Sequence, residues 1–393
     1  MTGTIKRVIR RSLVNQVAGR AKEEKKDDSS RIYVPTGSTL LNLALSDKVD
    51  GGFLTGKLGN IVGDRSAGKT FLALTVLATC AYIPAFDNYL LIHDDSEEAD
   101  EFNTVKLFGQ KAANRILPPS LNRDDPKNSH TIMDFQCNVR RLLKGDKPII
   151  YIQDSLDSLK TKEELEHAED LQKAHESGKE AKGTYGMEKA KQIGILLRLI
   201  LSDLKNTESL VLIISQTRDN IDPMSFQKRT RSGGKALYFY CSYEMWLAVA
   251  RQLNTNINNK PRNIGVISRI KGTKNKSSGK SREIDVPIFY DYGLDDIGSC
   301  IDFLISEGWW ESSKSGMITA KEFDIICQRT KLINTIEEKN LIGKLQRVTA
   351  ACWMDIETRL KIDRKPKFPT KQEEIDNEAK EKEEVLDEGE GDK

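Results

Sequence analysis

The apolar positions of this 393-residue chain follow two patterns that alternate along the sequence. Short, mainly apolar runs predict buried strands. We place strands at Leu58–Val62, Tyr89–Ile92, Ile149–Ile152, Leu210–Ile214, Ala236–Val249, Ile264–Ile270 and Asp285–Tyr290. Apolar residues that recur with a helical period predict helices at Lys69–Tyr82, Met133–Leu143, Ile193–Leu204 and Ile336–Leu360. Strands that alternate with helices favour an α/β fold.

Three stretches before the C-terminal region depart from this pattern. Residues 110–130 are typical of a loop insertion, and the charged, glycine-containing residues 160–188 predict a mobile loop with a frayed helix. Residues 1–22 lack Asp and Glu, and they carry an apolar stripe flanked by Lys and Arg, formed by Ile5, Ile9, Leu13 and Val17. Such a segment fits either a mitochondrial transit peptide or a helix that docks on a partner subunit. A polar linker follows to residue 30.

One loop matches the pattern G-x-x-x-x-G-K-[ST] without a mismatch. It consists of Gly63, Asp64, Arg65, Ser66, Ala67, Gly68, Lys69 and Thr70. A predicted strand precedes the loop and a predicted helix follows it, which is the context of a P-loop. Main-chain N–H groups and the helix N-terminus would hold a triphosphate. Lys69 would contact the β- and γ-phosphates, and the Thr70 hydroxyl would contact Mg²⁺.

Polar side chains stand at the ends of three other predicted strands. The strand at Tyr89–Ile92 runs into the acidic segment 94–98, and Ile149–Ile152 is followed by Gln153 and Asp154. Asp154 fits the acidic position that holds Mg²⁺ through water in P-loop proteins. Gln153 is unusual, because that position is normally apolar. Gln216 follows the strand at Leu210–Ile214 and is a candidate γ-phosphate sensor.

The segment Thr217–Lys235 favours contact with nucleic acid. It contains five basic residues against Asp219 and Asp222, with apolar residues between them, and it ends in Ser-Gly-Gly-Lys. Long loops inside compact domains are usually functional. Basic groups that alternate with apolar ones suit single-stranded nucleic acid, where phosphates are neutralised and side chains stack or wedge against bases.

Composition and charge narrow the class further. The 38% hydrophobic and 31% charged residues are typical of a soluble globular protein, and no apolar run is long enough to span a membrane. Six scattered cysteines without a C-x-x-C pair argue for free thiols and against a zinc site. Residues 373–393 hold eleven Asp and Glu against three Lys, so they carry −8 and the remainder +10. A basic body with an acidic tail, which we expect to be disordered, suggests a polyanionic partner.

The motifs described above, in their order along the chain, resemble those of the RecA-type strand-exchange recombinases, most closely the phage UvsX-like branch. The resemblance runs from about Pro35 to Glu311 and rests on the P-loop, Gln216, the Gly-Gly-Lys loop and the Lys-Asn-Lys segment together. It implies a P-loop ATPase core with a mostly parallel twisted sheet and helices on both faces. It also implies that residues 4–22 form the family's polymerisation helix, although the transit peptide stays an alternative.

The resemblance also implies roles for individual residues. Glu97 falls at the general base, Gln216 at the γ-phosphate sensor, and Tyr290 at an aromatic beside the adenine. Lys274 and Lys276 fall at a lysine pair that reaches the γ-phosphate of the neighbouring subunit. The expected DNA contacts are Arg218, Ile221, Phe226, Lys228, Arg229, Arg231, Gly233, Gly234 and Lys235.

The sequence departs from the family at two places. Thr104 stands where the family usually has a Tyr that stacks on adenine, and Phe102 is a candidate replacement. The first DNA loop, within residues 160–188, is longer and more acidic than usual, so we assign it no contact residue.

These observations predict an ATP- and Mg²⁺-dependent recombinase that forms filaments on single-stranded DNA and exchanges strands with a homologous duplex. Expected partners are single- and double-stranded DNA, further copies of the chain, a single-strand-binding protein and a recombination mediator, in the cytoplasm. The rival functions are a helicase-like motor and a non-catalytic mediator. The expected segments are a polymerisation helix and linker (1–30), the core (31–296), a small helical region (297–365) and the acidic tail (366–393).

Overall fold

The computed structural model describes residues 31–98, 102–120, 128–166, 186–219, 229–364 and 367–368. Several predictions of the sequence fall outside these residues. They are the helix and linker in 1–30, the DNA contacts Ile221, Phe226 and Lys228, most of the first DNA loop, and the acidic tail. Two units are described separately, residues 1–352 and residues 353–393.

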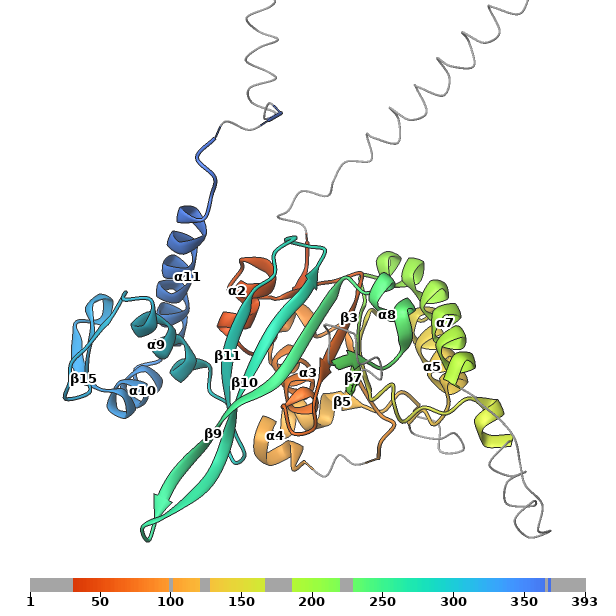
Figure 1. Ribbon diagram of the computed structural model, residues 1–393, viewed down its shortest axis with the longest axis horizontal. Coiled ribbons are helices and arrows are strands. Elements are labelled where there is room, and N and C mark those ends of the chain that lie inside the picture. Colours follow the sequence, from red (N-terminus) through yellow and green to blue (C-terminus); the bar gives the residue numbers. More distant parts are fainter. Residues whose placement is uncertain are drawn as a thin grey trace, which may run out of the picture. The chain divides into compact units, whose positions relative to one another are not determined.

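A large, mostly parallel sheet forms the centre of the first unit (Figure 1). Its strands in spatial order are β12 (Gly293–Leu294), β11 (Glu283–Phe289), β10 (Lys260–Asn275), β9 (Tyr243–Ile257), β3 (Lys57–Gly63), β7 (Leu210–Asp219), β6 (Ile149–Asp154), β4 (Leu90–Asp95) and β5 (Ile116–Leu117). The strands from β9 to β5 are parallel, whereas β10, β11 and β12 pair in antiparallel fashion. A short strand, β8 (Arg229–Arg231), pairs with the end of β7.

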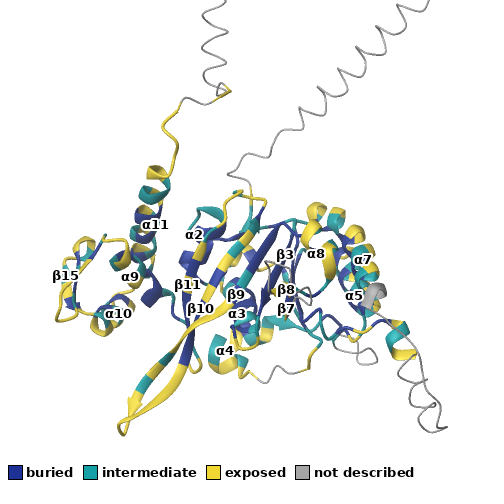
Figure 2. Cartoon of the chain, in the orientation of Figure 1, coloured by how far each residue is buried: buried dark blue, intermediate teal, exposed yellow. Residues whose placement is uncertain are grey.

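Helices cover both faces of this sheet. They are α2 (Thr39–Ser46), α3 (Lys69–Tyr82), α4 (Thr104–Arg115), α5 (Ile132–Leu143), α7 (Gly186–Asn206) and α8 (Gly234–Tyr240). On one face, Tyr151 of β6 and Val211 of β7 pack with Phe135 of α5 and Leu196 of α7 in one buried cluster. The helix α3 contacts β3, β4, β6 and β7. Central strands such as β6 are buried on both sides (Figure 2), as their continuous apolar sequence predicts.

Smaller elements complete the described chain. A two-stranded sheet joins β1 (Tyr33–Val34) to β2 (Phe53–Leu54), and a second antiparallel sheet contains β13 (Glu311–Ser312), β14 (Met317–Ala320) and β15 (Ile325–Gln328). The remaining helices are α9 (Asp296–Ser306), α10 (Arg329–Glu338), α11 (Ile342–Arg359) and the 3₁₀ turns Pro84–Phe86 and Lys321–Phe323. Within the described residues, no helix has the length and apolar character to cross a membrane.

The α/β prediction is confirmed, but several boundaries were wrong. Residues 236–240 belong to α8 and not to a strand, because the glycine pair Gly233-Gly234 starts a helical turn before β9. Residues 110–115 continue α4. The predicted helix Ile336–Leu360 is two helices, interrupted at Asn340, which has a φ of 50°. The C-terminal region is not purely helical, since β13, β14 and β15 lie within it.

Candidate nucleotide site and adjoining DNA loop

The loop between β3 and α3 has the backbone shape that its glycines permit. The strand β3 ends at Gly63, and α3 begins at Lys69. Gly68 has a φ of +86°, and a Cβ atom there would lie 2.6 Å from Ile288 Cδ1 of β11. A side chain at this position would therefore meet both backbone strain and a wall of the sheet. The predicted order of strand, glycine loop and helix is confirmed.

Lys69 and Thr70 point toward polar partners at the edge of the sheet. Lys69 Nζ donates to the carbonyl oxygen of Asp64 at 2.7 Å. Burial lowers the pKa of Lys69, while the carboxylates of Asp154, Glu97 and Asp64 act in the opposite direction. Thr70 Oγ1 donates to Asp154 Oδ2 at 2.5 Å. The structure thus brings together the P-loop and the acidic end of β6, which lie 84 residues apart.

Glu97 lies next to the same group of side chains. Gln216 Nε2, at the carboxyl end of β7, donates to Glu97 Oε1 at 3.0 Å. The Ser155 hydroxyl also donates to Glu97 Oε1. The carboxylate is thereby held between the ends of β6 and β7, close to Asp154 and Lys69. A carboxylate in this place is positioned to accept a proton from a group bound over the P-loop.

Gln153 has a structural role that its position in the sequence did not reveal. Its side chain is fully buried, and its Nε2 donates to Ser96 Oγ at 2.8 Å. The Ser96 hydroxyl also lies 2.7 Å from the hydroxyl of Ser158. An apolar residue at position 153 could not make this link. Gln153 therefore fixes the turn that carries Glu97.

Lys69, Thr70, Glu97 and Asp154 line a pocket of about 540 Å³. That volume is in the range of small-molecule sites. The pocket is lined by Ser66, Gly68, Lys69, Thr70, Phe71, Asp95, Glu97, Phe102, Asp154, Val266, Ile288 and Tyr290. One side is polar and acidic, and the other is apolar. Both predicted adenine neighbours, Phe102 and Tyr290, line the pocket, and the rings of Phe71 and Phe102 meet edge to face at 6.0 Å.

Sequence reasoning missed the apolar wall. Phe71, Val266 and Ile288 form a buried cluster that closes one side of the pocket. Val266 and Ile288 are paired across β10 and β11, so their shared face depends on sheet register. No local motif marks them.

The donor set fits a nucleotide with Mg²⁺. The described residues contain no cluster of three or more His, Cys, Asp or Glu that would form a metal site from protein alone. The hydroxyl of Thr70 and the carboxylate of Asp154 instead provide two adjacent oxygen atoms. Mg²⁺ in nucleotide sites is commonly held by one or two protein oxygens together with phosphates and water.

Asp157 connects the nucleotide site to the predicted DNA loop. Its Oδ2 accepts from the Gln216 N–H at 2.7 Å and from the Ser232 hydroxyl at 2.6 Å. Its Oδ1 pairs with Arg218 at 3.2 Å. One carboxylate therefore fastens both ends of the segment that leaves the sheet after β7 and returns at β8. The signal that marks Asp154, an acid at the end of a buried strand, also marks Asp157, which follows the same strand.

The arginines of β8 bond within the chain. Arg229 pairs with the carboxylate of Asp64 in the P-loop. Arg231 lies 3.1 Å from Glu244 and stacks over Tyr238, with its guanidinium 4.6 Å from the ring centroid. The pair between Arg229 and Asp64 places the close of the predicted DNA loop beside the P-loop.

The glycine pair and Lys235 follow β8 at the start of α8. Gly233 has a φ of +81°, and a Cβ atom there would lie 2.7 Å from Leu156 Cδ2. Gly233 and Gly234 line a second pocket together with Arg218 and Lys189. Burial lowers the pKa of Lys189, whose ammonium donates to the main-chain oxygens of Asp157 and Leu159. This pocket adjoins the loop that the sequence assigned to DNA.

Lys274 and Lys276 lie away from the P-loop of their own chain. Both ammonium groups contact main-chain oxygens at the C-terminal end of α8, each reaching Phe239 O at 3.3 Å. Lys274 also lies over the ring of Tyr238, 4.4 Å from its centroid. Positive charge is favourable at a helix C-terminus. Lys274 is paired with Glu244 of β9, which in turn is paired with Asn60 of β3, three residues before the end of that strand at Gly63.

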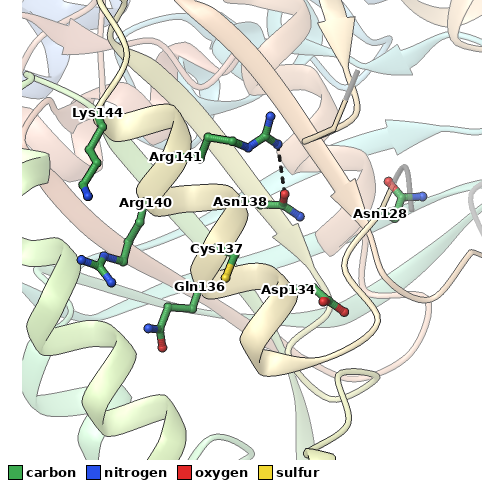
Figure 3. Close-up of a pocket in the computed structure, with 8 residues that line it drawn as sticks. All are labelled: Asn128, Asp134, Gln136, Cys137, Asn138, Arg140, Arg141 and Lys144. Atoms are coloured by element: carbon green, nitrogen blue, oxygen red, sulfur yellow. Dashed lines mark hydrogen bonds between the residues drawn. The ribbon is translucent and has the colours of Figure 1, made fainter. Parts of the chain in front are cut away.

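A separate hollow of about 610 Å³ runs along α5 (Figure 3). It is lined by Asn128, Asp134, Gln136, Cys137, Asn138, Arg140, Arg141 and Lys144. Nearly all of these residues come from one helix, and Arg141 Nη2 donates to Asn138 Oδ1 at 3.1 Å. The hollow lacks the strand ends and glycine loop that mark the pocket at Lys69, so we place the nucleotide in the latter.

Comparison with known proteins agrees with the fold. A family model described as the RecA N-terminal domain matches residues 15–295. Protein RecA of Mycobacterium ulcerans is 26% identical over 315 residues, covering 78% of this chain and 82% of the relative. Protein RecA of Thermus thermophilus is 25% identical over 327 residues, covering 81% and 87%, respectively. Because the family model matches most of the sequence, the chain belongs to the RecA family.

Proposed function

We propose that this protein is an ATP-dependent DNA recombinase. It forms a helical filament on single-stranded DNA, pairs that strand with a homologous duplex and exchanges the strands. Membership of the RecA family and the pocket at Lys69 support ATP and DNA as ligands. Identities of 25–27% to bacterial RecA proteins fit a distant branch of the family, and we assign the chain to the phage UvsX-like branch.

Within this proposal, each polar residue of the pocket has a distinct task. Lys69 and the main chain of the P-loop bind the phosphates, and Thr70 and Asp154 hold Mg²⁺, the latter through water. When bound, Mg²⁺ neutralises charge on the phosphate oxygens. Glu97 accepts a proton from the attacking water as general base. Tyr290 and Phe102 hold the adenine.

The observation that carries the proposal is the hydrogen bond between Gln216 and Glu97. It joins the hydrolytic side of the pocket to the strand that leads into the basic loop. A γ-phosphate over Lys69 would offer Gln216 a second partner. A change at Gln216 would act on the loop through Asp157, which binds both its ends. This gives a route by which nucleotide orders a DNA loop.

The DNA site of the proposal is the segment from Arg218 to Lys235. Its contacts would be Arg218, Ile221, Phe226, Lys228, Arg229, Arg231, Gly233, Gly234 and Lys235. Arg229 and Arg231 are paired with Asp64 and Glu244, respectively, so they would exchange these carboxylates for DNA phosphates on binding. Loops that address phosphates and base faces bind without sequence preference.

Lys274 and Lys276 complete the site from the neighbouring subunit. In their own chain both ammonium groups bond the main chain at the end of α8 and not the P-loop, which supports a role at the P-loop of a neighbouring subunit. Residues 4–22 provide the polymerisation helix. A single-strand-binding protein and a mediator are the expected partners, and the cytoplasm is the expected location.

The test is joint-molecule formation between a single-stranded circle and a homologous linear duplex, with and without ATP. We expect joint molecules only with ATP and Mg²⁺. ATP hydrolysis that is stimulated by single-stranded DNA but yields no joint molecules would instead favour a motor. Absence of both activities would favour a mediator.

A further inference from the structure

The carboxylate of Asp157 is held by three donors of different kinds. Its Oδ2 accepts from the main-chain N–H of Gln216 at 2.7 Å and from the Ser232 hydroxyl at 2.6 Å. The guanidinium of Arg218 lies 3.2 Å from Oδ1. One main-chain N–H, one hydroxyl and one guanidinium therefore converge on a single anion.

This set of donors is typical of a phosphate site. Protein contacts to nucleic acid phosphates come from Arg and Lys, from hydroxyl side chains and from main-chain N–H groups. Carboxylates and phosphates both offer arginine negatively charged oxygen acceptors. Asp157 thus satisfies, from within the chain, a group of donors that would suit a phosphate.

The donors lie in the wall of an open pocket. This pocket has a volume of about 800 Å³ and is also lined by Lys160 and Lys189. The side chain of Asp157 is 13% exposed, whereas that of Arg218 is 62% exposed. A ligand in the pocket therefore has access to the ion pair without unfolding of the sheet.

Asp157 differs from the acids that hold the arginines of β8. Arg229 and Arg231 each exchange a side-chain ion pair, with Asp64 and Glu244, respectively. Displacement of Asp157 would in addition free the main-chain N–H of Gln216, whose side chain bonds Glu97 in the nucleotide pocket. The contacts of Asp157 therefore link the occupancy of this phosphate-like position to the nucleotide pocket.

We propose that Asp157 occupies the position of a DNA phosphate in the protein without DNA, and that single-stranded DNA displaces it from Arg218 and Ser232. The identity of the ligand rests on the proposed function, whereas the competition rests on the contacts of Asp157. Asp157 then lowers the affinity for DNA and makes that affinity depend on nucleotide. A γ-phosphate that draws Gln216 toward itself weakens one of the three bonds that hold the carboxylate, so it favours the displaced state.

The test is fluorescence anisotropy of a labelled oligodeoxythymidine with the full-length protein, with and without ATP and Mg²⁺. Asp157→Asn removes the charge but keeps an oxygen that accepts from Gln216 and Ser232. Charge-assisted hydrogen bonds are about twice as strong as neutral ones, so affinity without nucleotide should rise about 5- to 10-fold. The gain should be smaller with ATP. Asp157→Ser, which has a shorter neutral side chain, should change the affinity in the same direction.

Two controls separate competition from general electrostatics. Glu164 lines the same pocket, but its carboxylate accepts from the main-chain N–H of Thr161. Glu164→Gln should therefore raise the affinity less than Asp157→Asn, and its effect should vanish at high salt. In an Arg218→Gln background, Asp157→Asn should lose most of its gain, because the contact for which Asp157 competes is absent.

Three results would overturn the inference. One is a loss of single-strand affinity in whichever Asp157 variant keeps the wild-type Tm, which would make Asp157 a fastener that the DNA site requires. Another is a gain no larger than that of Glu164→Gln. The third is a gain that persists in full in the Arg218→Gln background. Failure of the proposed recombinase function is measured separately, because it would leave the wild-type protein without joint molecules while the gain in Asp157→Asn remained.

Discussion

Two inactive variants of this protein should regain ATP hydrolysis when they are mixed. One is Lys69→Ala, which loses the phosphate-binding ammonium of the P-loop. The other is Lys274→Ala/Lys276→Ala, which keeps its P-loop but loses the lysine pair. If the lysines act on the neighbour's nucleotide, each complete site requires one subunit for the P-loop and another for the lysines.

The course of β10 keeps Lys274 away from the P-loop of its own chain. The Ser268 hydroxyl donates to Ala67 O of the P-loop at 2.7 Å, which fixes where β10 passes the site. Lys274 lies six residues farther along β10, roughly 20 Å away at the rise of a strand. That distance exceeds the reach of a lysine side chain. In its own chain, Lys274 instead contacts the end of α8.

The expected recovery of ATP hydrolysis follows from random assembly of the two variants. In a head-to-tail filament, every interface pairs one P-loop with one lysine pair, so an equal mixture has about one intact interface in four. Hydrolysis should recover to about a quarter of the wild-type rate per subunit.

The assay is ATP turnover on single-stranded DNA across a series of mixing ratios, with co-assembly checked by electron microscopy. The recovery should be greatest near equal amounts. Complementation also separates catalysis from folding, because a lysine variant that merely lost the contact with α8 and misfolded would restore nothing. A mixture that forms joint filaments yet hydrolyses no more than its components would refute the assignment. The lysines would then serve only to stabilise α8.

Three other perturbations test separate parts of the molecule. Glu97→Gln should retain ATP and DNA binding but slow hydrolysis by about 10²–10⁴-fold, and a normal rate would transfer the role of base to another acid at the end of β4. Deletion of residues 373–393, which carry −8, should strengthen duplex binding at low salt, and unchanged binding would limit the tail to a role in solubility. Burial raises the pKa of Asp296 above its usual value. Between the pKa of this group in the unfolded chain and its pKa in the folded protein, the folded protein therefore retains a proton that the unfolded chain releases. The stability of the folded protein falls as the pH rises between these two pKa values. Asp296→Asn should therefore flatten the fall in Tm with rising pH above about pH 4, whereas parallel curves for the two proteins would contradict this account.

The sequence by itself determined the parts of this protein that depend on local chemistry. The P-loop could be identified because its strand, glycines and helix are consecutive, so their geometry is fixed within a few residues. Buried parallel strands could be found because both of their faces are apolar. Asp154, Glu97 and Gln216 were candidates because each follows such a strand, and the structure brings all three to one edge of the sheet.

The tertiary structure decided whatever depends on pairing between distant segments. Val266 and Ile288 wall the nucleotide pocket through strand register, and Gln153 holds Ser96 across β4 and β6, so neither role can be read from neighbouring residues. Residues 250–257 of β9 and 260–263 of β10 were missed for the same reason. These segments have few apolar residues because they are largely exposed, and hydrophobic periodicity marks a strand only where one of its faces is buried.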